Sequence, residues 1–348
     1  MGRWTLRRWI GWILILSILL LGMAGVSISL GAVRIPLLET WSIILNHFFH
    51  FHFSPTWTEN NAAIILKIRL PRVLSAIMVG AALSLSGAVL QALLRNPLAD
   101  PFVLGISSGA ALGAVLAILL GCGAFLFGHY AIPGVAFLGA LMTIFLVYFI
   151  SRVAGRVPTQ TMLLAGVIVN SFFSAIIMFL ISATSNEKLH GVTFWLMGNL
   201  EFLSFQFFRP VFFYLLIGSL LLFYLAKDLN LLSLGEETAA ELGVEVEKLK
   251  KVSFLLTSLI TGAVVAVSGL IGFVGLIIPH LVRLLWGPDH RFLLPAAAIL
   301  GGLFLAAADT MARTIMAPNE IPVGVITALS GAPFFIYLLR KKGHVVYH

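Results

Sequence analysis

A serine and a histidine in apolar surroundings are the first residues of this chain to suggest catalysis. Gly105, Ser107 and Gly109 form a G-x-S-x-G pattern, and His280 lies in a different apolar segment. Such a pair could act as nucleophile and base in an intramembrane serine hydrolase. The nucleophile elbow, however, needs a strand-to-helix turn, and this pattern lies in a run expected to be helical. The sequence therefore does not favour a hydrolase.

Acidic residues inside apolar segments are the second candidates for chemistry, because ion-coupled transporters usually bury a carboxylate near the middle of the membrane. Of the 14 Asp and Glu residues, only Asp309 lies well inside such a segment, and it lies near the outer end. The chain has no G-x-x-x-x-G-K-[ST] loop, so we do not expect it to bind ATP in the P-loop manner. An ion-coupled secondary transporter stays an alternative, which proton-driven uptake without ATP would favour.

The composition predicts a membrane protein that crosses the bilayer many times. Hydrophobic residues make up 60% of the 348 residues and charged residues 10%, whereas a soluble domain has roughly a quarter charged. The mean hydropathy is +1.04. The single Cys122 excludes an internal disulfide framework and a cysteine-rich metal site.

Runs of apolar residues long enough to span the hydrocarbon predict an all-α fold with ten transmembrane helices. We treat the first as a retained helix, because it is too long for a signal-peptide core and no clear cleavage site follows. The ten spans are expected at residues 10–32, 72–92, 101–120, 131–150, 161–182, 208–226, 252–271, 273–285, 292–312 and 322–340.

The distribution of Lys and Arg predicts the orientation of these helices. Placing the N-terminus in the cytoplasm puts most of the 22 basic residues on that side, and both termini are then cytoplasmic. The formal net charge of +8 is explained mainly by this bias and needs no nucleic-acid partner.

One polar loop, residues 227–251 between the sixth and seventh spans, is too large for a simple connector. Leu and Ala residues alternate with acids, and Gly235 and Gly243 divide the loop into two short helical pieces. It could rest on the membrane surface as an amphipathic helix, or it could be a docking element for a cytoplasmic partner. Its acidic residues argue against simple attachment to anionic lipid.

The sequence also indicates an internal repeat. The pattern G-A-x-x-x-x-S-G occurs at residues 80–87 in the second span and again at 262–269 in the seventh. Segments five spans apart run in opposite directions, as in the inverted repeats of transporters. Spans 2–5 and 7–10 are the two predicted repeats.

Motifs along nearly the whole chain resemble one family. They occur at residues 69–72, 86–110, 163–170, 194–200, 229–244, 269–283, 287–291, 307–313 and 321–340. With these motifs the chain resembles the permease subunit of the ABC importers for ferric siderophores, heme and vitamin B12. That family has ten transmembrane helices per subunit and works as a homodimer around a central pathway, in agreement with the predicted topology. The resemblance implies one permease domain over residues 1–348.

The resemblance implies that Arg69, Arg72 and Arg313 dock a substrate-binding protein at the outer face. Guanidinium groups suit this role because they grip carboxylates through two hydrogen bonds and remain charged. Alternatively, these arginines anchor helix ends at the lipid headgroups, or Arg313 pairs with Asp309 one turn earlier.

The resemblance also identifies the polar loop, at about residues 229–246, as a pair of coupling helices for a separate ATPase subunit. Two such subunits would use ATP and Mg, and this chain itself would bind no cofactor and no metal. The Leu and Ala residues would make the contact and the acids would form its rim. The residues implied in coupling are Leu232, Leu234, Gly235, Glu236, Ala239, Ala240, Leu242 and Gly243.

Further matches imply a pathway with a cytoplasmic gate. Asn96 and Leu98 match its inner mouth, while Thr159 and Gln160 fall at the gate, where some members carry a small hydroxyl residue instead of the bulkier Gln160. Asn170 is the most polar residue of the fifth span, which should line the pathway. Pro97 also suits the end of a helix.

The histidines of the segment 47–52 raise the possibility of heme or metal binding. His47, His50 and His52 alternate with aromatic residues, and an interfacial loop explains them better.

The cargo is not specified by the motifs. A ferric siderophore is favoured because Val169 and Asn170, after the LLAG segment, resemble iron-type members; heme and vitamin B12 are the alternatives. The implied location is the bacterial or archaeal cell (inner) membrane, and the implied binding protein is periplasmic or lipid-anchored.

Overall fold

The computed structural model describes residues 6–49, 57–122, 128–152, 157–200 and 205–343, and within these ranges it contains helices and no strand. The elements are α1 (Leu6–Ser29), α2 (Leu37–Phe49), α3 (Glu59–Ala63), the π-helix η1 (Ile64–Arg69), α4 (Leu70–Leu93), α5 (Ile106–Leu119), the 3-10 helix η2 (Gly128–Tyr130), α7 (Ala131–Ser151), α8 (Thr159–Ser182), α9 (Asn186–Leu196), α10 (Phe205–Tyr224), α11 (Ala226–Leu232), α12 (Glu236–Glu241), α13 (Val246–Ser268), α14 (Val274–Trp286), α15 (His290–Thr314) and α16 (Val323–Gly343).

Ten apolar segments in the described residues correspond to the ten predicted spans. Six helices are long and apolar enough to cross a membrane by themselves. A seventh apolar segment is α10, which is followed after a bend of 51° by the short helix α11. Three shorter apolar helices, α5, α14 and α16, supply the rest. The predicted all-α, multi-pass fold is therefore confirmed.

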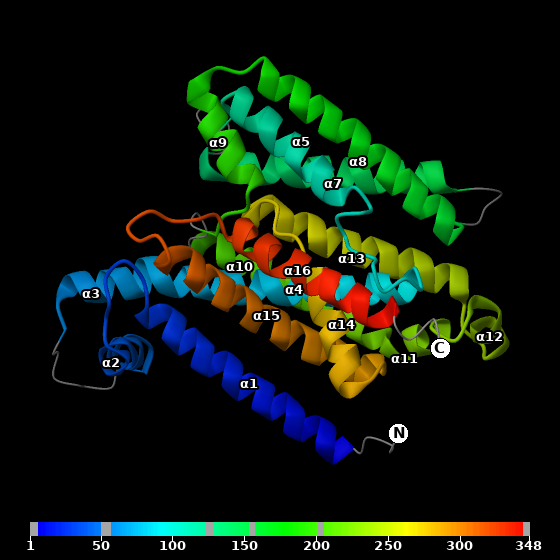
Figure 1. Cartoon of the computed structure of the whole chain (residues 1–348), viewed down its shortest axis with the longest axis horizontal. Coiled ribbons are helices and arrows are strands. Elements are labelled where there is room, and N and C mark those ends of the chain that lie inside the picture. The colour runs from blue at the N-terminus through cyan, green and yellow to red at the C-terminus, as the bar shows by residue number, and fades with distance from the viewer. Residues whose placement is uncertain (1–5, 50–56, 123–127, 153–156, 201–204, 344–348) are drawn as a thin grey trace.

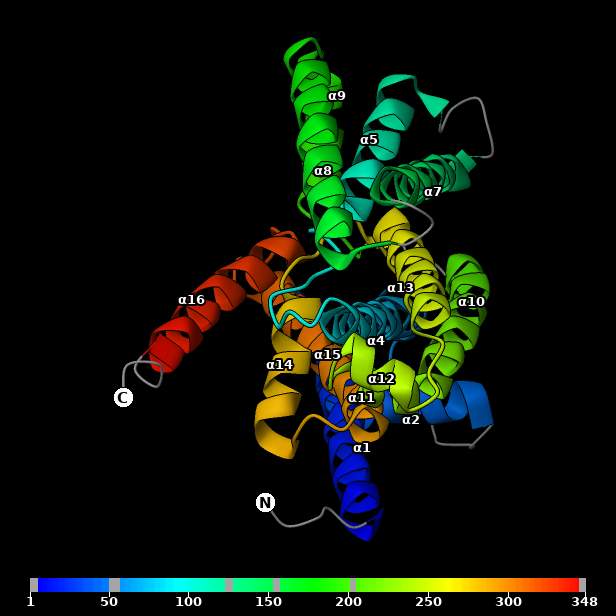
Figure 2. The same cartoon turned by 90° about the vertical axis from the view of Figure 1, so that its right-hand side faces the viewer.

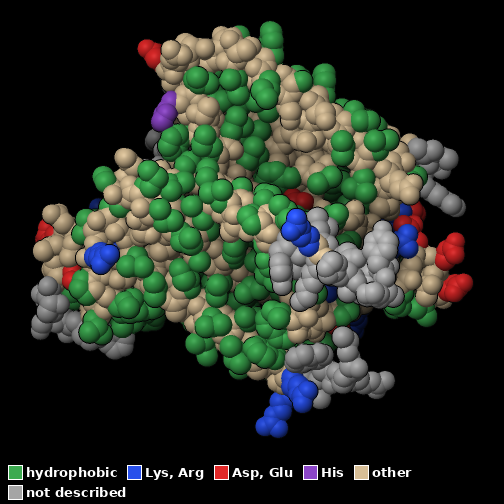
Figure 3. All heavy atoms as spheres, in the orientation of Figure 1, with side chains coloured by type: hydrophobic (Ala, Val, Ile, Leu, Met, Phe, Trp, Pro, Cys, Tyr) green, Lys and Arg blue, Asp and Glu red, His purple; other side chains and the backbone are tan. Residues whose placement is uncertain are grey.

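The two ends of the molecule differ in the elements that they carry. The start of α1 and the end of α16 lie at the same end as α11 and α12, whereas α2 and α3 lie at the opposite end (Figure 1). We call these the inner end and the outer end, after the orientation that the basic residues predict. Charged side chains lie mainly toward both ends, and apolar side chains cover much of the surface between them (Figure 3).

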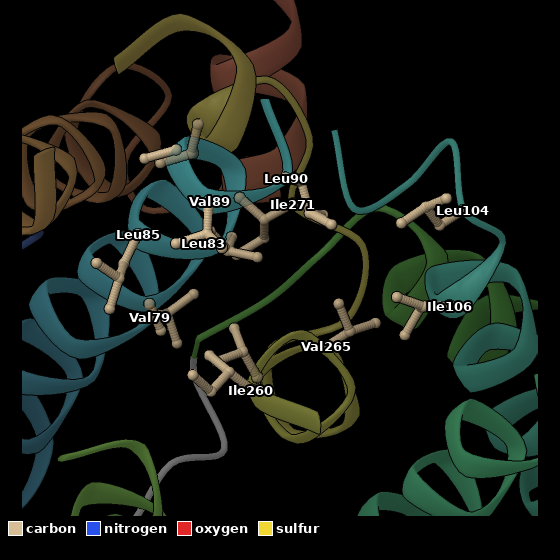
Figure 4. Close-up of a cluster of buried hydrophobic side chains, with 14 of the residues drawn as sticks. Val79, Leu83, Leu85, Val89, Leu90, Leu104, Ile106, Ile260, Val265 and Ile271 are labelled. Atoms are coloured by element: carbon tan, nitrogen blue, oxygen red, sulfur yellow. The ribbon is translucent and has the colours of Figure 1, made fainter. Parts of the chain in front are cut away.

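Helix α4 forms the centre of the fold (Figure 2). Nearly all of its side chains are buried, including polar ones such as Ser84 and Gln91. Its apolar side chains Val79 and Leu83 lie beside Ile260 of α13 (Figure 4). Burial of this kind stabilises the bundle mainly through close packing, because lipid is as apolar as the helix surface.

Glycines allow α4 to approach its neighbours at backbone distance. A Cβ on Gly80 would overlap the carbonyl of Gly301 in α15, and a Cβ on Gly87 would overlap that of Gly275 in α14. Small residues at such crossings are typical of membrane helices. The small-residue pattern at 80–87 is thereby explained by packing.

The packing also follows the predicted inverted repeat. Helix α4 packs on α14 and α15, whereas α13, its counterpart in the second repeat, packs on α5 and α7 of the first. Each leading helix is thus surrounded by helices of the other repeat. The repeats are therefore interlocked and do not form two separate bundles.

Two short helices, of which α2 is amphipathic, were not predicted from the sequence. Helix α2 contains His47, so the expected loop is wrong at this residue, while His50 and His52 lie outside the described residues. Helix α9 follows α8 at the outer end. Both are too short and too polar to register as spans.

Candidate docking, coupling and gate sites

Arg69 lies at the end of the π-helix that precedes α4. Leu70 donates its backbone N–H five residues back to Ile65, and Pro71, which has no N–H, lies in the first turn of α4. The Arg69 side chain points away from the surface and donates to the carbonyls of Ile28 and Ser29 at 3.0 and 2.9 Å, and also to that of Val33. It thus fastens the end of α1 to the start of α4.

Arg72, Asp309 and Arg313 form a buried ionic cluster at the outer end. Asp309 accepts from Arg72 Nε on one oxygen and from Arg313 Nε on the other, both at 2.9 Å. Arg313 also donates to the carbonyls of Leu30 and Ser27, each at 3.0 Å. Arg72 Nη1 lies 2.7 Å from Glu320, whose side chain is 41% exposed.

This geometry corrects the expectation that the three arginines present free guanidinium groups to a binding protein. Arg69, Arg72 and Arg313 are only 5%, 6% and 5% exposed, and each donates hydrogen bonds to acceptors within the chain. A buried guanidinium must be paired because its desolvation is costly. The alternatives, anchoring of helix ends and pairing of Arg313 with Asp309, are what the structure shows. Of the three, only Arg72 has a partner that reaches the surface.

Helix α11, the first piece of the polar loop, is fixed to the rest of the chain. Its Leu229 and Leu232 are fully buried. Asn230 donates to Asp289 at 2.9 Å and accepts from the backbone N–H of His290 at 2.8 Å. Partial burial alone would raise the pKa of Asp289, but hydrogen bonds from Arg291 and Asn230 outweigh it and lower that pKa to about 2.

Helix α12, the second piece, is more exposed. Leu234, Ala240 and Leu242 are open to a partner, whereas Leu232 and Ala239 are fully buried inside the chain. The expectation that Leu232 and Ala239 contact the ATPase is therefore wrong, because their neighbours within the chain already cover them. Gly235 and Gly243 have φ of +135° and +88°, which explains glycine at the two ends of α12.

One residue at the inner end was missed by sequence reasoning. Lys250 belongs to the basic residues of the loop 227–251, yet its side chain is 6% exposed and lies 3.2 Å from both Glu236 and Glu247. Its position i+3 from Glu247 on α13 could have indicated the second contact. The contact with Glu236 depends on tertiary structure and has no sequence signal.

The candidate gate residues lie in two groups. Asn96 accepts from the Leu98 backbone N–H at 2.9 Å and so closes its own turn after α4. Thr159 begins α8 and donates to Glu236 of α12 at 3.4 Å, while Gln160 is exposed beside it. Asn170 lies about three turns further along α8 and is half-buried. A gate formed by these residues stays a prediction.

The G-x-S-x-G pattern has a structural explanation. Gly105 has φ +78° and stands before α5, and Ser108 donates to the Gly105 carbonyl at 2.8 Å. Added atoms at Gly105 would contact the backbone of Gly166 in α8, so the glycine permits close packing. Ser107 lies in the first turn of a helix that no described strand precedes, so the elbow of a hydrolase is not formed.

Comparisons with known proteins agree with this architecture. Residues 15–341 match the model of the FecCD transport family, and the chain belongs to that family. It is 40% identical over 344 residues to the hemin transport system permease protein HmuU of Yersinia pestis, covering 98% of each chain. It is 46% identical over 287 residues to the cobalamin import system permease protein BtuC of Halobacterium salinarum, covering 82% of this chain and 75% of that one.

Two further matches have the same character. The uncharacterized ABC transporter permease protein YvrB of Bacillus subtilis is 43% identical over 326 residues, which is 90% of this chain and 89% of that one. A solved structure described as an inward-facing conformation of a metal-chelate type ABC transporter superposes with a TM-score of 0.82 and 35% identity, over 94% of this chain and 98% of that one. The sequence-based family resemblance is thus confirmed.

Proposed function

We propose that this chain is the permease subunit of a binding-protein-dependent ABC importer and forms the translocation pathway for a metal chelate. The match to the FecCD family over residues 15–341 is the observation that carries the proposal. The chain itself would perform no catalysis and bind no cofactor. ATP and Mg would be used by two separate ATPase subunits on the cytoplasmic side of a bacterial or archaeal cell membrane.

The exposed part of α12 supports an ATPase contact at the inner end. Leu234 and Leu242 are large apolar side chains exposed at the two ends of a six-residue helix. Glu237 and Glu241 are exposed beside them and would form an acidic rim. An apolar centre with a polar rim is the usual make-up of a protein interface.

Two helices support a homodimer. Phe172 and Phe179 of α8 and Leu329 and Ile336 of α16 are exposed. The outer surface of a membrane protein can meet lipid with such residues, but α8 also exposes the polar Gln160, Ser171 and Ser174. A helix face that mixes large apolar and polar groups suits a pathway shared between two copies better than it suits lipid.

A binding protein would dock at the outer end. Arg34 and Lys67 are exposed there, and the Arg72–Glu320 pair lies at the edge of the buried cluster. We propose that Arg72 meets a carboxylate of the binding protein in place of Glu320, while Arg69 and Arg313 support it from inside. Replacement of Glu320 by Gln should then strengthen docking by about 1 kcal/mol or less, as expected for one exposed charge pair.

A ferric siderophore is the proposed cargo, with heme and vitamin B12 as alternatives. The names of the relatives include iron(3+)-hydroxamate, hemin and cobalamin systems and so do not choose among them. The choice depends on the resemblance of Val169 and Asn170 to iron-type members. Both residues lie on α8, with Val169 buried and Asn170 half-buried.

The surroundings of Asp309 argue against an ion-coupled secondary transporter. Both of its oxygens accept from arginines, at 2.9 Å each. A carboxylate that carries a proton or cation through a transport cycle must be able to release its partners. Two buried guanidinium groups thus occupy both oxygens of Asp309.

Reconstitution tests the proposal. The chain is co-purified with its cognate ATPase and binding protein, placed in proteoliposomes, and supplied with iron(3+)-hydroxamate, hemin or cobalamin. We expect uptake of one cargo that requires ATP and the binding protein. Uptake that a proton gradient drives without ATP would contradict the proposal.

A further inference from the structure

Lys250 occupies an unusual position for a lysine at the inner end. Its side chain is almost fully buried, and its Nζ lies 3.2 Å from Glu236 Oε2 and 3.2 Å from Glu247 Oε1. A buried ammonium is tolerated only when it is paired, because removing it from water is costly. Glu236 belongs to α12 and Glu247 to α13, so Lys250 joins two elements that the chain connects only through the Gly243 turn.

Both carboxylates use their second oxygen on the start of α8. Glu236 Oε1 accepts from the Thr159 hydroxyl at 3.4 Å, and Glu247 Oε2 accepts from the Val157 backbone N–H at 3.3 Å. Each acid therefore bridges Lys250 and the α8 N-terminus. Two segments that are about eighty residues apart in sequence are joined through one lysine.

The start of α8 has a physical need for these carboxylates. Its N-cap residue is Pro158, which supplies no side-chain hydrogen bond to the helix. The first N–H groups of a helix lack internal partners and carry a partial positive charge, so nearby anions stabilise them. Glu236 and Glu247 supply the negative charge that the local sequence of α8 lacks.

The rest of α8 is bound to the chain by few elements. It packs on α5 and α7, and these three helices lie together on one side of the molecule (Figure 2). The inner end of α8 is linked to the loop helix α12 through Glu236 and to α13 through Glu247. Movement of α12 can therefore reach α8 directly, without first moving the central helix α4.

From this geometry we propose that Lys250 is a positioning residue that holds Glu236 and Glu247 on the α8 N-terminus and so transmits movement of α12 to α8. The inference rests on the proposed function, because α12 is the expected contact of the ATPase. Lys250 touches neither the cargo nor the ATPase. It acts through the two acids.

Matched lysine variants test this role in the reconstituted complex. Lys250→Met removes the ammonium group that pairs with Glu236 and Glu247, whereas Lys250→Arg keeps a cation at the same place. Lys248→Met is the control, because this substitution removes the same charge two residues away. Lys248 pairs with Glu245 at 3.3 Å on the surface. Uptake and ATP hydrolysis are measured together, so that their ratio reports coupling.

We expect Lys250→Met to lower uptake per ATP hydrolysed by about tenfold, which is within the range typical of coupling between two sites. Lys250→Arg and Lys248→Met should stay close to the unmodified complex. An unchanged ratio in Lys250→Met would overturn the inference. A loss shared equally by Lys250→Arg and accompanied by a lower unfolding temperature in both would show a structural role alone.

A distance measurement within the chain separates this inference from the proposed function. Cys122 is replaced by Ser, spin labels are placed at the exposed Leu164 of α8 and Glu241 of α12, and labelled chains are diluted with unlabelled copies. Lys250→Met should broaden the distribution of distances, whereas Lys248→Met should not. An unchanged distribution of distances would overturn the positioning role of Lys250 even if transport is observed. Absence of ATP-driven uptake in the unmodified complex would refute the proposed function alone.

Glu247→Gln keeps the inference testable if Lys250→Met does not fold. The amide still accepts from Val157 but loses the charge that holds Lys250. We expect a smaller fall in uptake per ATP than that of Lys250→Met. Coupling equal to that of the unmodified complex in a folded Glu247→Gln variant would overturn the inference.

Discussion

Each end of this protein contains a cluster of three charged side chains. At the outer end an acid is buried between two bases, and at the inner end a base is buried between two acids. At the outer end Asp309 lies between Arg72 and Arg313 at 2.9 Å, and backbone carbonyls near the end of α1 accept from both Nη atoms of Arg313. At the inner end Lys250 lies between Glu236 and Glu247 at 3.2 Å, and these acids are 32% and 48% exposed.

The difference indicates different mechanical roles. The outer cluster is enclosed and joins helices that also pack closely, since α15 lies against both α1 and α4. The inner cluster is open to water and joins α12, α13 and the start of α8. We interpret the outer cluster as an anchor and the inner cluster as a joint that can move during transport.

Reversal of all three outer arginines should give the largest effect. Replacing Arg69, Arg72 and Arg313 by Glu buries three unpaired carboxylates, two of them beside Asp309, so we expect no folded protein. The measurement is the yield of monodisperse protein in detergent. Arg34→Glu is the matched control, because Arg34 is exposed at the same end. Normal folding of the triple variant together with a selective loss of binding-protein affinity would instead support direct docking by all three.

A single change in the anchor should still be severe. Asp309→Asn leaves Arg72 and Arg313 without their shared charge, and we expect the free energy of unfolding to fall by about 3–5 kcal/mol. Glu320→Gln removes the other, exposed partner of Arg72 and should cost about 1 kcal/mol or less. Reversible unfolding in mixed micelles measures both. Equal costs would show that the anchor is not buried.

A bulky residue at Gly243, in the turn between α12 and α13, should impair transport more than stability. Gly243 follows α12 with φ +88°, and a Cβ atom at this position would have open space around it. The left-handed backbone adds about 1–3 kcal/mol of strain in any non-glycine variant. Gly243→Ala shares this strain without the bulk and is the control.

We expect Gly243→Trp to keep ATP hydrolysis and to lose most uptake, because the indole holds α12 away from the ATPase cleft. Gly243→Ala should retain most uptake. Normal binding of the ATPase together with normal uptake in the Trp variant would contradict this account of α12.

The smallest effect is expected at the fixed part of the inner end, where α11 meets α15. The folded-state pKa of Asp289 is lowered from 3.8 to about 2, so its stabilising contribution is complete above about 3.8 and is lost as the pH falls through about 2. The unfolding temperature of the unmodified protein should therefore fall across this window more steeply than that of Asp289→Asn. Parallel curves would show that Asp289 does not anchor α11.

The sequence predicted the spans well and the polar contacts less well. Apolar length and the charge bias suffice for ten helices, because both follow from the bilayer itself. Helices α2 and α9 were missed because short helices have neither signal. The small-residue pattern at 80–87 predicted close packing, and Gly80 and Gly87 do lie against backbone.

The burial of the outer arginines could not be read from the sequence. Their acceptors are mainly backbone carbonyls between residues 27 and 33, and any residue type can supply a carbonyl. Only the Asp309–Arg313 pair, four residues apart on one helix, had a local signal. The contact between Lys250 and Glu236 also lacks a local signal, since these residues are 14 positions apart and approach each other only in the folded chain.

The central claim is that the inner end moves in the transport cycle while the outer anchor stays fixed. Two spin-label pairs in the full complex with Cys122→Ser test it: Leu164 of α8 with Leu284 of α14 at the inner side, and Val33 with Met311 of α15 at the outer end, all four exposed. On going from the nucleotide-free to the ATP-bound complex, we expect the inner distance to change and the outer distance to stay constant. A constant inner distance, or an outer distance that changes as much as the inner one, would contradict the account.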